Sequence, residues 1–344
     1  ESDKYKFINN EGVRFLIDGN VQVDGDRIKL MVRLTDNLDG EQIWAEHFTR
    51  DLSIESLFEI QKDIVTEICS LIGSEYGIIM EKIASELKVS KPHKMETFIA
   101  FSKYYYFEAN QTPDAATDAF IALQQAIAND PGSGMAHAML ASLYGNRYML
   151  DVEDAEGAYH KMIELADEAT SLDLHNLTVR IVYVWKLFIC NEFERFYKEA
   201  EKCLSREPLP SLRLGSLGFY LSLAGDWDRG IAILDKVMLR NISFPLYYFG
   251  ATALNFYGNK KYTEAYKEAL QYDIPALFWG PMLRIAVTGQ LGSVSEASKD
   301  IAHLYQLKPD FDSKARYLIS RFVKEDTLVE HVLEGLVKAG MEVK

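Results

Sequence analysis

The side chains that most often carry chemistry in proteins are scattered along this 344-residue chain. Its histidines form no HExxH zinc motif, and His137, His160, His175 and His303 fall in different helical segments of the pattern. No GxxxxGK[ST] or GxGxxG sequence is present to cradle a phosphate, since Gly132-Ser133-Gly134 is only a loop after a proline. A GxSxG nucleophile elbow is also absent. The sequence therefore predicts no catalytic residue, no cofactor and no metal site.

Two acidic clusters have simpler explanations than a bound cation. Asp36, Asp39 and Glu41 surround a predicted turn, and their spacing differs from that of a calcium-binding EF-hand loop. The acidic run at residues 151–154 precedes a predicted helix, where carboxylates stabilise the positive end of the helix dipole. We interpret this run as the start of that helix, with a cation site as the alternative.

The overall charge bears on the kind of partner. Lys and Arg number 37 and Asp and Glu number 51, so the net charge is −14. This excess of acid argues against nucleic acid as a partner, because binding of the phosphate backbone needs a basic face. No apolar run approaches the roughly 20 residues of a membrane-spanning helix. The chain begins on the polar stretch Glu1–Lys4 without an initiator Met, so we expect a fragment or a processed form. We expect the cytoplasm as its compartment, or the periplasm if a membrane helix precedes residue 1.

The first part of the chain predicts an antiparallel sheet followed by a helix. Apolar and polar residues alternate over Arg14–Val23 and over residues 28–34, on either side of Asp24-Gly25-Asp26. Alternation around an Asp-Gly turn is the strongest local signal for a β-hairpin. A third alternating segment, Gln42–Thr49, completes a three-stranded meander. From Ser53 the apolar residues recur at helical spacing.

From residue 91 onward the pattern is helical and repetitive. The clearest unit is Ser211–Ile242, two amphipathic segments joined by a tight turn at Ala224–Trp227. Six residues that close successive units are spaced by 43, 34, 34, 33 and 34 positions: Pro131, Leu174, Pro208, Ile242, Pro275 and Pro309. This spacing resembles the tetratricopeptide repeat, a helical hairpin with a period of 34 residues. One hairpin cannot bury both of its apolar faces, so the resemblance implies a stack of about six.

Two features depart from a uniform array. The second unit has nine extra residues, which we place in a loop over Gly145–Gly157 that could serve a function. After the last repeat come two more amphipathic segments, Asp312–Val323 and Thr327–Lys338. We interpret these as capping helices, because a terminal repeat needs a polar outer face for solubility.

The segment from about Gly12 to Leu71 resembles the second half of the TolB amino-terminal-like domain. The resemblance rests on the strings RFLIDGNVQVDGDRIKLMVRLTDNLDGEQIWAEHFTRDL and LFEIQKDIVTEI. That family precedes tetratricopeptide repeats in bacterial signalling proteins, which resemble class III adenylate or guanylate cyclases or winged-helix regulators at their amino ends. The β-α portion that the family places before these strands is missing or shortened here. We therefore expect an unpaired sheet edge covered by residues 1–10, by the following helix or by a second copy of the chain.

Together these patterns predict a mostly α fold. A tetratricopeptide-repeat α-solenoid of about six helical hairpins plus capping helices follows a small antiparallel three-stranded β-meander with a helix, an α+β arrangement. The corresponding domains are a partial TolB amino-terminal-like domain over residues 1–90, repeats over residues 91–310 and capping helices over residues 311–344.

The resemblance also indicates where a partner would bind. In a tetratricopeptide array the first helices of successive hairpins line a concave groove, which here carries Thr178, Ile181, Trp185, Phe188, Phe219, Ser222, Tyr247, Leu254, Tyr257, Trp279 and Met282. These positions are mostly aromatic or apolar and lack the basic clamp that some family members use for a peptide carboxylate. We expect an apolar or aromatic peptide or helix as the ligand. The alternative is that the same side chains fill a tightly wound superhelix.

Three hypotheses about function remain. The favoured one is a non-catalytic interaction or regulatory module of a bacterial signalling protein, which binds a protein or peptide or self-associates. The second is a structural scaffold that only pairs two copies of the chain. The third is an enzyme or small-molecule sensor with a pocket between the β domain and the first repeats, near Trp44, Tyr104 and Tyr105.

Overall fold

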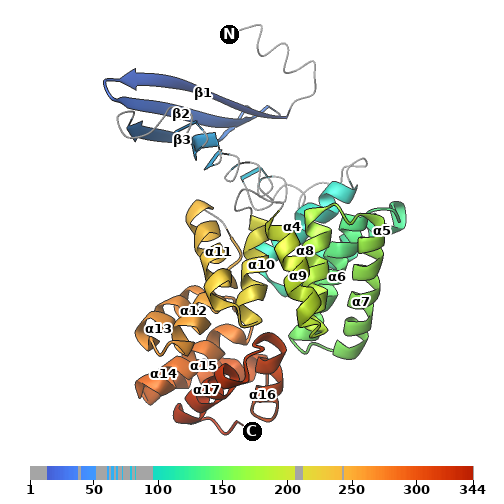
Figure 1. The fold of residues 1–344 in the computed structure, drawn as a ribbon, viewed down its shortest axis with the longest axis vertical. Helices are drawn as coiled ribbons and strands as arrows, with labels where there is room; N and C mark the ends of the chain where they lie inside the picture. The colour runs from blue at the N-terminus through green and yellow to red at the C-terminus, as the bar shows by residue number, and fades with distance from the viewer. Residues whose placement is uncertain are drawn as a thin grey trace. The chain divides into compact units, whose positions relative to one another are not determined.

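The chain divides into two compact units, Glu1–Ser85 and Glu86–Lys344. The structure is a computed structural model. It describes residues 14–37, 40–51 and 96–343 except 206–211 and 242–243, and eleven single positions between 60 and 82. Figure 1 shows strands in the first unit and helices in the second. Residues 1–10, expected to cover the sheet edge, lie outside the described part.

The first unit contains the predicted three-stranded meander. Its strands are β1 (Phe15–Asp24), β2 (Arg27–Asp36) and β3 (Gln42–Asp51), in the spatial order β1-β2-β3 with both pairings antiparallel. Asp24 pairs with Arg27 across a two-residue turn in which Gly25 has a φ of 61°, a conformation that glycine adopts without strain. On one face of the sheet, Val32 and Phe48 are buried against Ile60 and Ile64 of the following helical segment.

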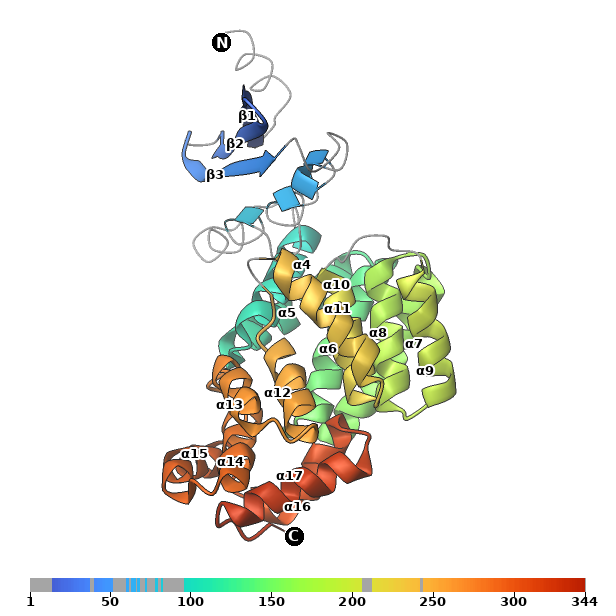
Figure 2. The same ribbon diagram turned by 60° about the vertical axis from the view of Figure 1, so that its left-hand side comes forward.

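The second unit is built from helices that pack in consecutive pairs, and each pair stacks on the next (Figures 1 and 2). The helices are α4 (Glu96–Asn110), α5 (Pro113–Asn129), α6 (Gly134–Met149), α7 (Ala155–Leu172), α8 (Leu177–Ile189), α9 (Phe193–Leu204), α10 (Leu212–Leu223), α11 (Trp227–Arg240), α12 (Tyr248–Gly258), α13 (Tyr262–Gln271), α14 (Trp279–Leu291), α15 (Val294–Leu307), α16 (Phe311–Phe322) and α17 (Asp326–Lys338). This arrangement confirms the predicted fold class, a mostly helical solenoid preceded by a small antiparallel sheet. None of the helices in the described part of the chain has the length and apolar character to cross a bilayer.

The helix ends agree with the repeat spacing read from the sequence. Helices α5, α7, α11 and α15 each end two residues before a predicted closing residue, namely Pro131, Leu174, Ile242 and Pro309. Small residues on the second helices of the hairpins are fully buried: Ala119, Ala126, Ala166, Ala169, Ala200 and Ala297. The spacing of the closing residues therefore predicts where these four helices end.

The prediction of a loop over Gly145–Gly157 is wrong. Helix α6 runs through Gly145 to Met149, and only residues 150–154 connect it to α7. The extra residues lengthen the helices instead, since α6 and α7 have 16 and 18 residues whereas α8 and α9 have 13 and 12. Gly145 serves packing, because a Cβ there would lie 2.9 Å from the indole nitrogen of Trp185. The acidic run does start the helix as predicted: Asp154 caps α7 by accepting a hydrogen bond from the Gly157 amide at 3.2 Å.

The short connection after α6 reaches helices far along the chain. The Asp151 carboxylate lies 3.2 Å from the Lys308 ammonium, 2.9 Å from that of Lys314 and 3.6 Å from the Arg321 guanidinium. We refer to these four residues as the Asp151 cluster. The Arg321 guanidinium also stacks over the Tyr148 ring, 4.1 Å from its centroid. The second hairpin is thereby joined to α15 and α16, more than 150 residues away in sequence.

Glu108 in α4 is a buried carboxyl group of this unit. Burial raises its pKa to about 7, although a hydrogen bond with Tyr104 acts in the opposite direction. The folded state therefore binds a proton that the unfolded state, with a pKa of about 4.3, releases, and between these values stability falls as the pH rises.

Replacing Glu108 with Gln should therefore stabilise the helical unit at alkaline pH. Gln keeps the shape of the protonated carboxyl and cannot ionise, so the gain over wild type should grow by roughly 2–3 kcal/mol between about pH 4.5 and pH 8. Urea unfolding of both proteins at several pH values measures this difference. A gain that is the same across the whole range would contradict a buried, proton-binding Glu108.

Candidate binding cleft

The aromatic positions predicted to line a groove lie in the packed interior of the helical unit. Ten of the eleven are less than a tenth exposed, and Phe219 is half-buried. Trp185 stacks on Phe188 and Tyr220, with ring centroids 5.3 and 4.4 Å apart. Phe219, Leu254 and Trp279 border a cavity of only about 20 Å³, enough for one water molecule. These side chains fill the superhelix in this structure, and peptide binding at them stays a prediction.

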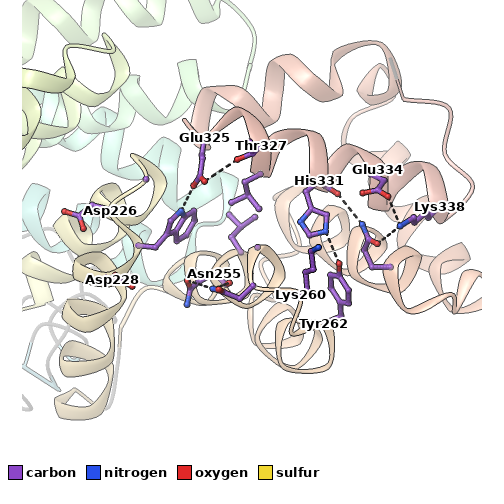
Figure 3. A pocket seen from close by; sticks show the side chains of 17 residues that line it. Asp226, Asp228, Asn255, Lys260, Tyr262, Glu325, Thr327, His331, Glu334 and Lys338 are labelled. Carbon is purple, nitrogen blue, oxygen red and sulfur yellow. Dashed lines mark hydrogen bonds and ion pairs between the residues drawn. The ribbon is translucent and has the colours of Figure 1, made fainter.

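A much larger cleft, of about 740 Å³, lies elsewhere on the helical unit (Figure 3). One wall is a polar face of α17, on which Thr327, His331, Glu334 and Lys338 recur at helical spacing. The opposite wall is formed by the turn before α11, the end of α12 and the start of α13. Its size falls in the usual range of ligand pockets. We call it the α17 cleft.

Helix α17 holds its position because it crosses α14 at very short range. A Cβ on Gly289 of α14 would lie 1.9 Å from the carbonyl oxygen of Gly335 in α17, and one on Gly335 would lie 2.6 Å from that of Ala286. Only glycine at both positions allows this approach. The Tyr257 hydroxyl adds a hydrogen bond to the His331 carbonyl at 2.8 Å. The apolar face of α17 is thus buried on α14 while its polar face lines the cleft.

Hydrogen bonds between the walls fix several side chains of the α17 cleft. The Trp227 indole donates to Glu325 at 2.8 Å, and the Tyr262 hydroxyl lies 2.9 Å from Nε2 of His331. Lys338 donates to the Gln290 carboxamide oxygen at 2.8 Å and also pairs with Glu334. Burial lowers the pKa of the His331 imidazole, and the nearby lysines 260 and 338 lower it further against the opposing effect of Glu334. His331 is therefore neutral at pH 7.

Other polar groups of the cleft have no partner in the described part of the chain. The Lys260 ammonium, the Asp228 carboxylate and the Asn255 amide nitrogen make no hydrogen bond or ion pair with any described residue. Asp226 and Asp228 lie at one end of the cleft and Lys260 lies toward the other, beside His331 and Tyr262 (Figure 3). The cleft is thus acidic at one end, basic at the other and offers free polar groups to a ligand.

This site was not predicted from the sequence. Of the eleven groove residues that the sequence predicts, only Leu254 also lines the α17 cleft. The sequence predicts the polar face of Thr327–Lys338 to be the solubilising surface of a cap, whereas four residues of this segment line the cleft with polar side chains. Among the described residues there is no group of three or more His, Cys, Asp or Glu side chains that could hold a metal ion.

Comparison with known proteins gives a weak and partial match. No known protein-family description matches the chain. It is similar to a Rhizobium meliloti (strain 1021) protein described as "Putative adenylate cyclase 3", with 24% identity over 130 residues. The aligned part covers 38% of this chain and 21% of that relative, so the chain spans about a fifth of the relative's length. This similarity links the chain distantly to a signalling protein.

Proposed function

We propose that this chain is a non-catalytic regulatory region of a bacterial signalling protein related to adenylate cyclases, and that its helical unit binds a peptide segment of a protein partner in the α17 cleft. The single observation that carries the binding proposal is an open cleft of about 740 Å³ in which Lys260, Asp228 and Asn255 keep polar groups without described partners. Polar groups arranged in a preformed cleft provide orientation and specificity for a ligand.

The finer family assignments belong to the same proposal. The 34-residue spacing, together with helices that end at the closing residues, supports the assignment of the hairpins as tetratricopeptide repeats. The three-stranded meander and the helical segment after it support a partial TolB amino-terminal-like domain. The distant similarity to a protein described as an adenylate cyclase supports a regulatory role in signalling. Formation of cyclic AMP from ATP by the purified chain would contradict the non-catalytic part of the proposal.

Filling the α17 cleft should weaken peptide binding without unfolding the protein. Thr327 is exposed and lines the cleft, and within the described part of the chain its side chain bonds only to the nearby Glu325, so Thr327→Trp places a bulky ring in the cleft. Peptides selected from a random library on the wild-type chain should lose roughly tenfold or more in affinity for this variant, a change of about 1.4 kcal/mol. Fluorescence anisotropy with labelled peptides gives the dissociation constants.

Val337→Trp is the matched control. Val337 lies on the same helix and is 54% exposed, but it does not line the cleft. The selected peptides should bind this variant as tightly as the wild type. Equal binding to Thr327→Trp, or a failure to select any peptide, would count against the α17 cleft as a binding site.

A further inference from the structure

The shape of the α17 cleft favours an elongated ligand. Its α17 wall extends from Thr327 to Lys338, which at 1.5 Å per residue corresponds to about 16 Å of helix. An extended peptide advances about 3.3 Å per residue, so roughly five or six residues match this length. Partway along, the amide nitrogen of half-buried Asn255 is available as a donor for a peptide carbonyl.

The two ends of the cleft carry opposite free charges. At one end the Asp228 carboxylate has no described partner, while its neighbour Asp226 is paired with Arg229 at 3.3 Å. Trp227 lies between them in the sequence, is half-buried and also lines the cleft, and an aromatic side chain together with a carboxylate suits a guanidinium or ammonium group.

The other end suits an anion. The exposed Lys260, on the wall opposite α17, lies beside His331, and Lys338 lies further along α17. Because Lys338 is already bound by Glu334 and Gln290, Lys260 is, among the described residues that line the cleft, the cation left to pair with an incoming carboxylate. Complementary charges of this kind determine which ligand binds and in which register.

We infer that the α17 cleft selects an extended peptide of five or six residues that carries a basic side chain at the Asp228 end and an acidic group at the Lys260 end. This inference rests on the proposed function, since it names the ligand class of the same cleft. The peptide backbone lies along α17, and the two charges at its ends fix its direction.

Selection from a random six-residue peptide library tests the inference, because such a library samples every charge pattern that the cleft could prefer. The library is selected in parallel on the wild-type chain and on the Asp228→Lys and Lys260→Glu variants. Wild type should enrich peptides with one basic and one acidic residue near opposite ends. Asp228→Lys should enrich peptides that are acidic at both ends, and Lys260→Glu peptides that are basic at both ends. In wild-type peptides, neutralising either charge should weaken binding roughly threefold to fivefold at low salt and less at high salt.

The outcomes separate this inference from the proposed function. Peptides that lose binding to Thr327→Trp but show no charge separation, or whose charges do not change on the two variants, would overturn the inference and leave cleft binding standing. Peptides of any sequence that bind Thr327→Trp as well as wild type would overturn both. Because Asp228 and Lys260 are exposed and have no described partners, neither variant should unfold the chain, and circular dichroism checks this.

Discussion

Replacing Gly289 with alanine should detach α17 from α14 and lower the free energy of unfolding of the helical unit by about 3 kcal/mol or more. The new Cβ would lie 1.9 Å from the carbonyl oxygen of Gly335 and 2.9 Å from the amide nitrogen of Ala339. Both are backbone atoms, so no side-chain rotation relieves the clash and the helix itself must move. Its displacement would expose an apolar face that is now buried: Leu328, Val329, Val332, Leu333 and Leu336.

Urea unfolding measures this loss, and Gly258→Ala serves as its control. Gly258 also lies in a helix of this region, but among the described residues a Cβ there meets only the Cδ1 of Leu328 at 3.4 Å, an ordinary contact. Alanine is the better helix former, so this variant should match or slightly exceed wild-type stability. Equal stability of Gly289→Ala and Gly258→Ala would contradict the close approach of α17 to α14 at Gly289 and Gly335. Peptide binding should be lost in Gly289→Ala, because α17 forms one wall of the cleft.

Replacing Asp151 with Asn should destabilise the same unit by about 2 kcal/mol at pH 7, because it leaves the buried Arg321 without its counter-charge. Asp151 has a φ of 52°, which Asn tolerates better than other residues, so the variant isolates the charge from backbone strain. Burial acts to raise the pKa of the Asp151 carboxyl, but hydrogen bonds and charges from Lys314 and Lys308 outweigh it and hold that pKa below its usual value.

The sign of this shift gives the pH dependence. Since the pKa in the folded state is below that in the unfolded state, the stabilisation by Asp151 is complete above about pH 4 and disappears as the pH falls through the folded value. The difference between wild type and Asp151→Asn should therefore shrink in acid, as measured by urea unfolding from neutral pH downward. Asp310→Asn is the control: its carboxylate also pairs with Lys314, but it is 46% exposed and should cost less than about 1 kcal/mol. If the difference in free energy of unfolding between wild type and Asp151→Asn stayed constant with pH, the Asp151 carboxylate would not be paired as in the Asp151 cluster.

Local patterns in the sequence were enough to predict the elements of the fold. The alternation on both sides of Gly25 predicted the hairpin. In β2 it reflects a sheet face that is buried against Ile60 and Ile64, whereas the apolar side chains of β1 at Ile17, Val21 and Val23 are exposed. The spacing of Pro131, Leu174 and Pro309 predicted helix ends, because each repeat ends its second helix at a similar place. Both signals depend on residues close together in the chain.

The errors arose where contacts between distant residues decide the structure. The sequence predicts a loop at Gly145, but this residue lies inside α6 and is a glycine because Trp185 leaves no room for a Cβ. The α17 cleft depends on the crossing at Gly289 and Gly335, two glycines 46 positions apart that follow no local pattern. A polar face on an amphipathic terminal helix looks the same in sequence whether it faces solvent or lines a binding site.

The Asp151 cluster also changes how the helical unit should respond to stress. In an open solenoid each repeat contacts only its neighbours, so the terminal repeats can fray while the centre stays folded. Here α16 packs against α6, and Asp151 ties the connection after α6 to Lys308 and Arg321. The second hairpin and the last therefore support each other directly. The repeats between them form a closed loop of contacts, in which fraying at the C-terminal end also weakens the second hairpin, and melting becomes cooperative across the loop.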